Sequence, residues 1–369
     1  MTDEPQRVLL HAFSTFNLGG PQARFVQLAN AFGKRYRHLV MAMDGNFQAA
    51  DRLDPGVDWR PLRLPVKRGG MLANRAAFRA ELKAHRPDLL LTYNWGAIEW
   101  AAANFPRLVP QVHAEDGFGP EEANRQLPRR VWTRRVLLGW THTPVVVASR
   151  NLERIAVGQW HLPAANVRFV ANGVAIPESA GVVRVPRASG PLTIGTVAGL
   201  RPEKNVARLI RAFAAVRARQ PARLVIVGDG PERAALETLA DELRVAADVE
   251  FTGYLADPIA RLRTFDLFAL SSNTEQLPIS MLEAMAHGIP VVATRVGDVA
   301  DVLPPMAHDG TCAADDVTFS ACLLLAVEQR ARWPQWVAAG LQRVKTDYAE
   351  DRMRGEWGRV FDATHELLH

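Results

Sequence analysis

Residues 267–290 have the sequence LFALSSNTEQLPISMLEAMAHGIP, and the rest of the chain is organised around them. The first four residues are apolar and are followed by Ser-Ser-Asn, which predicts a buried strand that ends in a polar loop. Pro278 suits a first helical turn, and the apolar residues after it predict a helix that ends near Gly288 and Pro290. Glu275 therefore lies in the loop, and Glu283, eight positions later, lies on the helix.

This arrangement suits an anionic ligand with several hydroxyl groups. Unpaired amides at a helix N-terminus favour a pyrophosphate, and carboxylates accept hydrogen bonds from sugar or ribose hydroxyls. Taken alone, two glutamates are more often a loop cap and a solvated helix residue. The remaining motifs must therefore decide between the two interpretations.

Length and composition indicate a two-domain globular protein. A chain of 369 residues exceeds what one hydrophobic core usually supports, and 48% apolar with 22% charged residues excludes a disordered chain. Cys312 and Cys322 have no paired metal-ligand spacing, so no metal site is expected. Residues 1–5 lack the features of a secretory signal, and no run of about 18 apolar residues occurs. We therefore expect a cytoplasmic protein without a membrane span.

Basic residues gather between Arg125 and Trp140. Five arginines alternate there with leucine, valine and tryptophan at helical spacing. This pattern suits an interfacial helix on anionic lipid, and equally a packed surface helix whose arginines pair with nearby acids. Nucleic acid is less favoured, because no known nucleic-acid-binding module accompanies the charge.

The first half of the chain alternates apolar runs with helical stretches. Val8–Phe13 predicts a strand, Gly19-Gly20 a glycine loop able to approach a phosphate, and the residues after it a helix. The two glycines do not have the spacing of a dinucleotide fingerprint, so a plain tight turn remains an alternative. Further strands are predicted at Leu39–Met43, Asp88–Tyr93, Leu108–His113, Val145–Ala148 and Val167–Val170. Such alternation predicts a parallel sheet with helices on both faces.

His113 is placed by this pattern at the carboxyl end of a strand, before an acidic loop. Ligands of open α/β sheets bind outside the carboxyl ends of strands, so His113 should line a cleft, although a structural loop histidine is also possible. Asn172-Gly173 ends the last of these strands with a turn. Residues 182–191 lack helical periodicity and are the expected interdomain linker.

A second alternation of strands and helices starts at Leu192. It includes the polar turn at residues 201–205, the glycine loop at 228–231 and residues 267–290. Two doubly wound halves of similar size predict two Rossmann-like domains, with a ligand in the crevice between them.

With these residues assembled, the chain resembles a retaining, nucleotide-sugar-dependent glycosyltransferase of the GT-B fold, in the family 4 (group 1) type. The pair Glu275 and Glu283 is the most specific element of this resemblance, which covers nearly the whole chain. Supporting motifs, in chain order, are Gly19-Gly20, His113, Asn172-Gly173-Val174, Arg201-Pro202-Glu203-Lys204-Asn205, Gly228-Asp229-Gly230-Pro231 and Phe251-Thr252-Gly253.

The resemblance implies an α/β protein of GT-B architecture, with two facing Rossmann-like domains, a cleft between them and a C-terminal helix crossing back. The expected domains are an N-terminal acceptor-binding domain at 1–185, a nucleotide-sugar-binding domain at 186–347 and a helix at 348–369 that packs back on the N-terminal domain.

Catalytic roles are implied for His113, Glu275, Lys204 and Arg201. His113 would lie beside the transferred sugar, Glu275 would bind sugar hydroxyls, and Lys204 would neutralise the pyrophosphate. Glu283 would bind the nucleotide ribose. The other implied donor-binding positions are Gly19, Gly20, Asn172, Gly228, Gly253, Tyr254, Leu277, Pro278, Ile279 and Ser280.

The chain departs from the family pattern beside the diphosphate. Many members have Gly-Arg-Leu before the lysine turn, whereas this chain has Ala-Gly-Leu at 198–200, and Arg201 is the candidate replacement for the missing cation. Gln276 stands where a glycine is usual, and Gly297-Asp298 where a pair of glycines is frequent. These differences concern the donor and the hold on its diphosphate.

The implied reaction needs no metal cofactor, because Lys204, Arg201 and helix amides would stabilise the leaving nucleoside diphosphate. Retention would follow from attack on the same face of the sugar, with the leaving phosphate accepting the proton of the acceptor. Glu275 would then position the sugar and would not act as a covalent nucleophile.

The predicted function is transfer of a hexose from a UDP- or GDP-linked sugar to a saccharide or lipid-linked saccharide in cell-surface polysaccharide synthesis. Residues 125–140 add an anionic membrane at the inner face of the plasma membrane as a possible partner. Two alternatives stay open: an epimerase or hydrolase of sugar nucleotides, which would act on the donor alone, and a two-domain solute-binding protein.

Overall fold

The computed structural model describes residues 6–66, 71–118, 120–122, 125–178 and 190–362. Contacts divide the chain into unit 1, residues 1–172 and 353–369, and unit 2, residues 173–352. The division falls before the expected boundary at 185–186, because Val174 already pairs with Ala349 of unit 2. Most of the expected linker, residues 182–189, and the last seven residues of the expected C-terminal helix lie outside the described residues.

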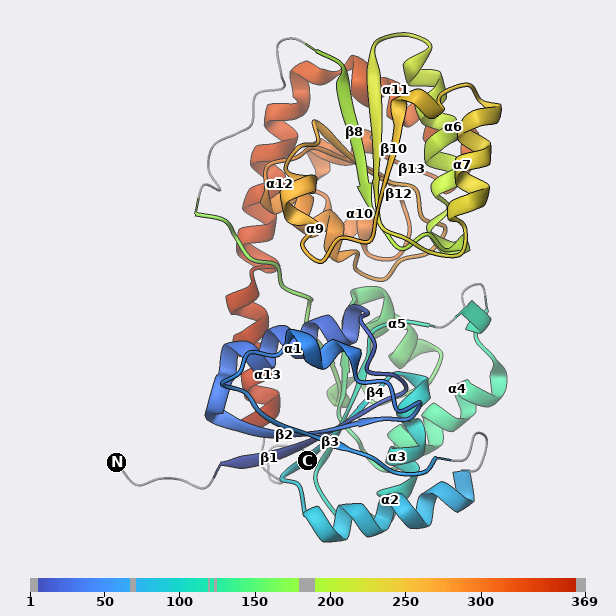
Figure 1. Cartoon of the computed structure of the whole chain (residues 1–369). Helices are drawn as coiled ribbons and strands as arrows, with labels where there is room; N and C mark the ends of the chain where they lie inside the picture. Colours follow the sequence, from blue (N-terminus) through green and yellow to red (C-terminus); the bar gives the residue numbers. More distant parts are fainter. Residues whose placement is uncertain (1–5, 67–70, 119, 123–124, 179–189, 363–369) are drawn as a thin grey trace. The chain divides into compact units, whose positions relative to one another are not determined.

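Unit 1 is built on a seven-stranded parallel sheet in its described part (Figure 1). The strands, in spatial order, are β3 (Asp58–Leu62), β2 (Tyr36–Ala42), β1 (Arg7–Phe13), β4 (Leu89–Tyr93), β5 (Gln111–Glu115), β6 (Val145–Val147) and β7 (Val167–Phe169). Six of the seven coincide, within a few residues, with apolar runs predicted as strands. The short, partly polar strand β3 has no such signal, because only one face of an edge segment needs apolar residues.

Helices cover both faces of this sheet. The helices of unit 1 are α1 (Gly20–Phe32), α2 (Met71–His85), α3 (Ile98–Ala103), α4 (Pro128–Arg134), the π-helix η5 (Arg135–Trp140), α5 (Arg150–Gly158) and most of α13 (Glu350–Asp362). One face packs on α1 and α13, and the other on α2, α3, η5 and α5.

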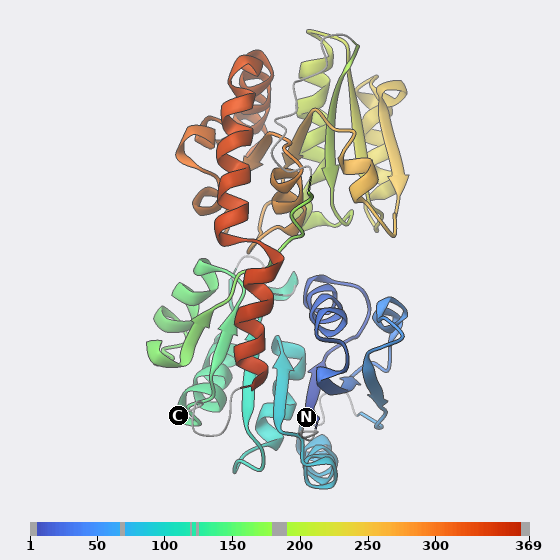
Figure 2. The ribbon, with the colours of Figure 1, turned by 90° about the vertical axis from the view of Figure 1, so that its left-hand side faces the viewer.

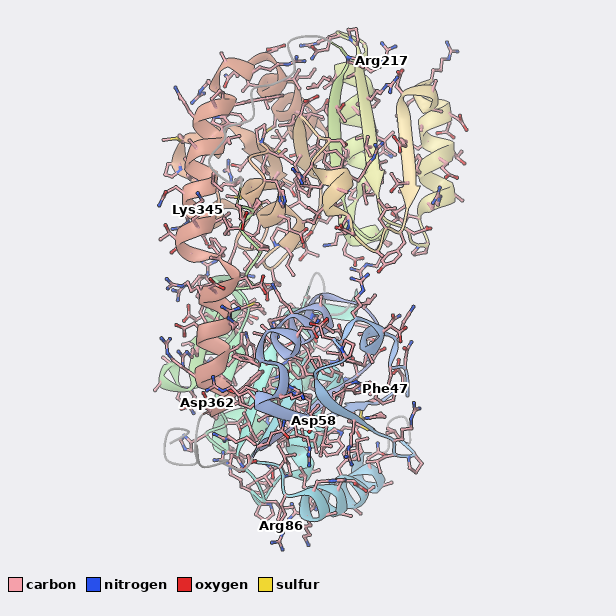
Figure 3. The ribbon with its side chains drawn as sticks, turned by 60° about the vertical axis from the view of Figure 1, so that its left-hand side comes forward. Phe47, Asp58, Arg86, Arg217, Lys345 and Asp362 are labelled. Carbon is pink, nitrogen blue, oxygen red and sulfur yellow. The ribbon has the colours of Figure 1, made fainter. Side chains whose placement is uncertain are left out.

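Helix α13 brings the end of the described chain back onto unit 1. Trp357 and Phe361 are buried against the sheet and α1, and Figure 2 shows the helix lying over the strands. Asp362, labelled in Figure 3, lies at the end of this helix. It accepts hydrogen bonds from Tyr36 Oη at 2.6 Å and from Arg35 at 2.5 Å. The C-terminal helix that the resemblance implies is therefore present.

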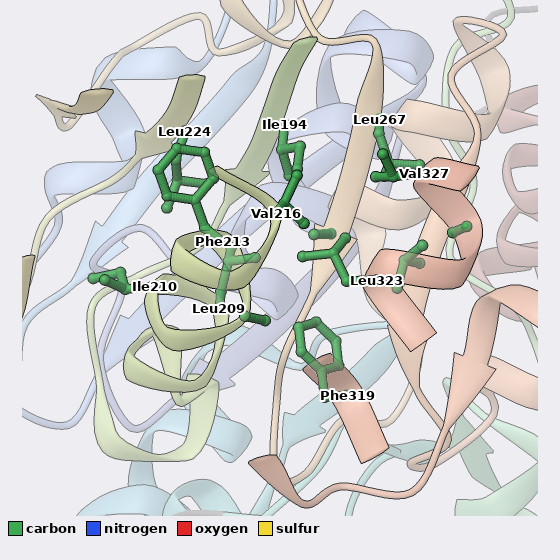
Figure 4. Packing of buried hydrophobic residues seen from close by; sticks show 14 of the residues in the cluster. Ile194, Leu209, Ile210, Phe213, Val216, Leu224, Leu267, Phe319, Leu323 and Val327 are labelled. Carbon is green, nitrogen blue, oxygen red and sulfur yellow. The ribbon is translucent and has the colours of Figure 1, made fainter. Parts of the chain in front are cut away.

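Within its described residues, unit 2 repeats the architecture with a six-stranded parallel sheet. Its strands, in spatial order, are β10 (Val249–Gly253), β9 (Ala222–Val227), β8 (Leu192–Val197), β11 (Leu267–Leu270), β12 (Val291–Thr294) and β13 (Thr311–Cys312). Its helices are α6 (Val206–Arg217), α7 (Arg233–Glu242), α8 (Ile259–Leu262), α9 (Ile279–Ala286), α10 (Val299–Val302), α11 (Asp316–Glu328) and α12 (Trp333–Asp347). Figure 4 shows Leu209 and Phe213 of α6 and Phe319 and Leu323 of α11 packed on one face of the sheet.

Candidate functional site

The order of strands in unit 2 identifies the edge where a ligand is expected. The strand order reverses its direction between β8 and β11, and open α/β sheets bind ligands outside the carboxyl ends of strands at such a point. The loops that leave β8 and β11 there are residues 198–205 and 271–278. These two loops carry both predicted cations and the first predicted glutamate.

Lys204 and Glu275 form an ion pair across the two loops. Lys204 Nζ lies 2.6 Å from Glu275 Oε1, and Ser272 Oγ donates to the same oxygen at 2.7 Å. The Glu275 side chain is only 8% exposed and that of Lys204 is 20% exposed, so the pair is largely shielded from water. Both predicted residues are therefore held together at the switch point, and the carboxylate has a fixed position.

The backbones of the same two loops are also joined. The amide of Asn273 donates to the carbonyl of Glu203 at 2.8 Å, and Ser271 Oγ donates to the carbonyl of Lys204 at 3.2 Å. Gly297 lies in the loop after β12, has a φ of 55° and packs against the loop that carries Glu275. A Cβ at Gly297 would lie 2.1 Å from the carbonyl oxygen of Glu275. A side chain at 297 would displace the backbone that carries the carboxylate.

Arg208 holds the loop that follows β11 in place. It lies on α6, is 4% exposed and donates to the carbonyl of Ser271 at 2.7 Å and to Asn273 Oδ1 at 2.9 Å. It also reaches the carbonyl of Ala314 and the carboxylate of Asp316. Sequence reasoning missed it, although a charge inside the apolar pattern of the predicted helix was a usable signal.

Arg201 is the more exposed of the two cations. Its side chain is 58% exposed and its Nε lies 3.0 Å from Glu203 Oε1. The same Nε lies 3.6 Å from the point where a Cβ at Gly199 would stand. The guanidinium thus lies beside position 199, where the resemblance expects an arginine.

Glu283 lies near the loop that follows β10. Burial and, to a smaller extent, the negative charge of Asp257 together raise the pKa of its carboxyl to about 7. Asp257 lies on that loop after the 60% exposed Tyr254, and Gly253 ends β10. Gly253 and Tyr254 are two of the donor-binding positions that the resemblance implies. The second glutamate and this loop are therefore close enough to interact.

Gly228 and Pro278 have local structural roles, and their part in donor binding stays a prediction. The amide of Gly228 donates to the carbonyl of Gly253, and a Cβ on Gly228 would lie 2.0 Å from the carbonyl oxygen of Ala198. Glycine is thus required at position 228, because the backbone there packs closely against the backbone of the loop at Ala198. Pro278 precedes α9 in an extended conformation and has no N–H, so in this segment Leu277, Ile279 and Ser280 carry the amides.

In unit 1 the predicted place of His113 was wrong. β5 begins only after Pro110, which has no N–H to donate, and runs to Glu115, so His113 is the middle residue of the strand. Its side chain is fully buried, with Nδ1 2.8 Å from Thr92 Oγ1 and Nε2 3.5 Å from Glu115 Oε2. It faces the layer of helices instead of a loop, and its catalytic role stays a prediction.

The other predicted positions of unit 1 lie at carboxyl ends of strands. Gly19 and Gly20 precede and begin α1, after β1. Asn172 follows β7 and accepts a hydrogen bond from Arg24 at 3.1 Å. Arg24 is buried, pairs with Asp116 and lies over the ring of Trp357. Asn172 therefore already has an internal partner, which sequence reasoning did not anticipate.

No group of three or more His, Cys, Asp or Glu side chains suited to a metal ion occurs among the described residues. Within the same residues, no helix has both the length and the apolar character needed to cross a membrane.

Comparison with known proteins agrees with this arrangement. The model of the family described as Glycosyltransferase Family 4 matches residues 18–176, and that of Glycosyl transferases group 1 matches residues 183–316. The chain belongs to the group 1, family 4 type of glycosyltransferases. The two matches fall on successive parts of the chain that carry the two parallel sheets.

Individual relatives match parts of this chain. N-acetyl-alpha-D-glucosaminyl L-malate synthase of Bacillus anthracis is 33% identical over 122 residues, which are 33% of this chain and 32% of the relative. The lipopolysaccharide core biosynthesis glycosyltransferase LpsD of Rhizobium meliloti is 31% identical over 163 residues, 43% of this chain and 46% of the relative. The matched segments thus span less than half of the length of these relatives. The crystal structure of Anabaena HepE in complex with UDP is similar in fold, with a TM-score of 0.79 and 18% identity over 96% of this chain and 99% of HepE.

Proposed function

We propose that this glycosyltransferase moves a hexose from a UDP- or GDP-linked sugar to a saccharide or lipid-linked saccharide, with retention of configuration, in cell-surface polysaccharide synthesis. The observation that carries the proposal is the Lys204–Glu275–Ser272 cluster at the switch point of the unit 2 sheet. Support for the donor class comes from the UDP in the similar Anabaena structure. Support for the acceptor class comes from LpsD, a relative named for lipopolysaccharide core synthesis.

The chemistry follows from charge. As the bond between the anomeric carbon and the diphosphate breaks, negative charge grows on the leaving phosphate, and Lys204 and Arg201 supply positive charge beside it. Amides at the start of α9 add hydrogen-bond donors. The acceptor oxygen forms the new bond on the same face, and its proton passes to the leaving phosphate. We therefore expect activity to persist in EDTA.

Glu275 has the part of a positioning residue in this scheme. Lys204 and Ser272 both bind its Oε1, so the carboxylate is held in one orientation from which it can accept hydrogen bonds from sugar hydroxyls. Donor binding would place the diphosphate near Lys204 and the sugar near Glu275. The free carboxylate would not need to attack the sugar.

The test is incubation with UDP-glucose or GDP-mannose and a panel of saccharide acceptors. Proton NMR of the product should show the anomeric configuration of the donor, and mass spectrometry should show no glycosyl adduct on Glu275. An inverted product or a trapped adduct would contradict the mechanism. Rapid turnover of the donor without an acceptor would favour the hydrolase or epimerase, and tight binding without turnover would favour a solute-binding protein.

We further propose a peripheral position of the enzyme at the inner face of the plasma membrane. Trp132 and Trp140 on α4 and η5 are 64% and 76% exposed, and Arg129 and Arg135 are exposed beside them. Phe105, 55% exposed, lies two residues from Arg107, which donates to the carbonyl of Thr141 at the end of η5. Aromatic rings flanked by arginines suit the headgroup region of an anionic bilayer.

Vesicle flotation tests this position. The wild type should float with vesicles containing anionic lipid at low salt and should float less in high salt or with neutral lipid. Trp132→Ala with Trp140→Ala should weaken flotation, whereas Val317→Ala, an 82% exposed apolar position of unit 2, should not. No binding to anionic vesicles at low salt would remove the proposal.

A further inference from the structure

The inner side of α4 carries a buried arginine, in contrast to the exposed arginines on its outer side. Arg134 is 1% exposed, and its guanidinium lies over the rings of Trp160 at 4.6 Å and Trp95 at 5.2 Å. Its Nε lies 3.2 Å from Glu115 Oε2, and its Nη1 lies 3.4 Å from Glu122 Oε1. Desolvating a guanidinium costs several kcal/mol unless carboxylates compensate it, so the ion pairs hold this side chain in place.

Glu115 connects this arginine to His113. Glu115 and His113 are two positions apart on β5, so their side chains point to the same face of the sheet. Glu115 Oε2 lies 3.5 Å from His113 Nε2 as well as 3.2 Å from Arg134 Nε. Glu115 Oε1 is buried and has no hydrogen-bond partner among the described residues. One oxygen of Glu115 therefore serves both the histidine and the arginine.

The contacts of His113 define one tautomer. A carboxylate has no proton to donate, so the hydrogen bond with Glu115 requires the proton on His113 Nε2. His113 Nδ1 must then accept, and the hydroxyl of Thr92, 2.8 Å away, is its donor. If Glu115 were neutral, the acid could donate to Nε2 and this preference would be lost.

We propose that Arg134 and Glu115 are positioning residues which hold the His113 ring in one orientation as its Nε2–H tautomer. Arg134 donates to the same oxygen of Glu115 that lies against His113, and Glu115 sets the position of the proton on the histidine. The consequence for turnover rests on the proposed function, in which His113 acts beside the transferred sugar. The tautomer itself does not depend on that function.

The first experiment reads the tautomer directly. Long-range ¹H–¹⁵N correlation spectra of the ¹⁵N-labelled full chain distinguish Nε2–H from Nδ1–H at His113, assigned with His113→Gln. The wild type should show Nε2–H. Arg134→Met and Glu115→Gln should shift the population toward Nδ1–H, and Arg134→Lys, which retains the charge, should restore Nε2–H.

Glu122→Gln is the matched control, because Glu122 forms an ion pair with Arg134 but, among the described residues, none with His113. It should leave the tautomer unchanged. If Arg134→Met does not fold, Glu115→Gln decides. An Nδ1–H wild type, or a tautomer that is the same in every variant, would overturn the proposal.

The second experiment measures turnover of UDP-glucose by release of UDP. Glu115→Gln should lower kcat by roughly tenfold or more with little change in KM, because a misplaced ring impairs the reaction more than binding. Glu122→Gln should keep both values. A shifted tautomer with unchanged kcat would overturn the link to turnover, whereas a wild type inactive on all nucleotide sugars would instead contradict the proposed function.

Discussion

Units 1 and 2 share a parallel sheet between layers of helices but use their charged groups differently. In unit 2 Lys204 and Glu275 lie in loops at the switch point and are joined to each other by an ion pair. In unit 1 the charges nearest the predicted histidine, Glu115 and Arg134, are enclosed in a layer of helices. The same topology thus presents a loop-based site in one unit and an internal charge network in the other.

The largest expected effect is on the loop-based site. Glu275→Ala and Lys204→Ala should each lower turnover of UDP-glucose by about a hundredfold, because fixed charge at the reacting bond would be lost. UDP release is the measurement. Glu328→Ala removes an equally charged but 60% exposed carboxylate of α11 and should leave turnover unchanged. If both site variants retained most of their activity, unit 2 would lose its assigned role.

Stability should distinguish buried from exposed arginines within unit 2. Arg208→Met leaves buried carbonyls and the amide oxygen of Asn273 without a donor and should lower the free energy of unfolding by about 3 kcal/mol. Arg217→Met removes a partly exposed pair with Asp248 and should change it by less than about 1 kcal/mol. Urea unfolding followed by fluorescence measures both. Equal losses of unfolding free energy in the two variants would contradict the inference that Arg208 holds the loop at Ser271 and Asn273 in place.

Acid should weaken unit 1 before unit 2. His11 and His38 are buried and bond each other, and burial lowers the pKa of His11 well below its ordinary value and that of His38 to about 4. As the pH falls, these histidines therefore bind protons in the unfolded chain before they do so in the folded protein. The free energy of unfolding is retained above pH 6.5 and falls as the pH drops toward 4. The loss for His38 is about 3 kcal/mol.

Hydrogen exchange, corrected for intrinsic rates, should locate this effect. Protection of residues 7–13 and 36–42 should fall between pH 7 and pH 5, while residues 222–227 of unit 2 serve as the internal control. His38→Gln should reduce the difference. Parallel loss of protection in both units would show that the histidine pair is not the cause.

The smallest expected effect concerns Glu283. Because its pKa is raised to about 7 and only the carboxylate accepts two ribose hydroxyls, affinity for UDP-glucose should rise about tenfold from pH 6 to pH 8. Calorimetry measures the affinity, and the phosphates of UDP-glucose stay ionised over this range. Asp257→Asn should move the transition to lower pH, and Glu283→Gln should abolish it. If the pH of this transition were unchanged in Asp257→Asn, the charge of Asp257 on the loop after β10 would have no influence on Glu283.

Much of the fold followed from local patterns. Apolar runs such as Val8–Phe13 and Leu267–Leu270 have the length and flanking loops of buried parallel strands, and both are strands in the structure. β13, with two residues, is too short to carry a pattern. The predicted strand Leu108–His113 lies two to three residues before the observed β5, because the apolar run that starts at Leu108 predicts a strand although Pro110 interrupts it.

The sequence by itself determined the alternation of strands and helices, the glycine-bearing loops, and the loop and helix that carry Glu275 and Glu283, because each depends on residues close together in the chain. Tertiary structure alone decided which charges meet. Arg208 reaches Ser271 and Arg24 reaches Asp116 across 63 and 92 positions, and Glu115 lies between His113 and Arg134. Such contacts depend on how distant segments pack, which no local pattern specifies.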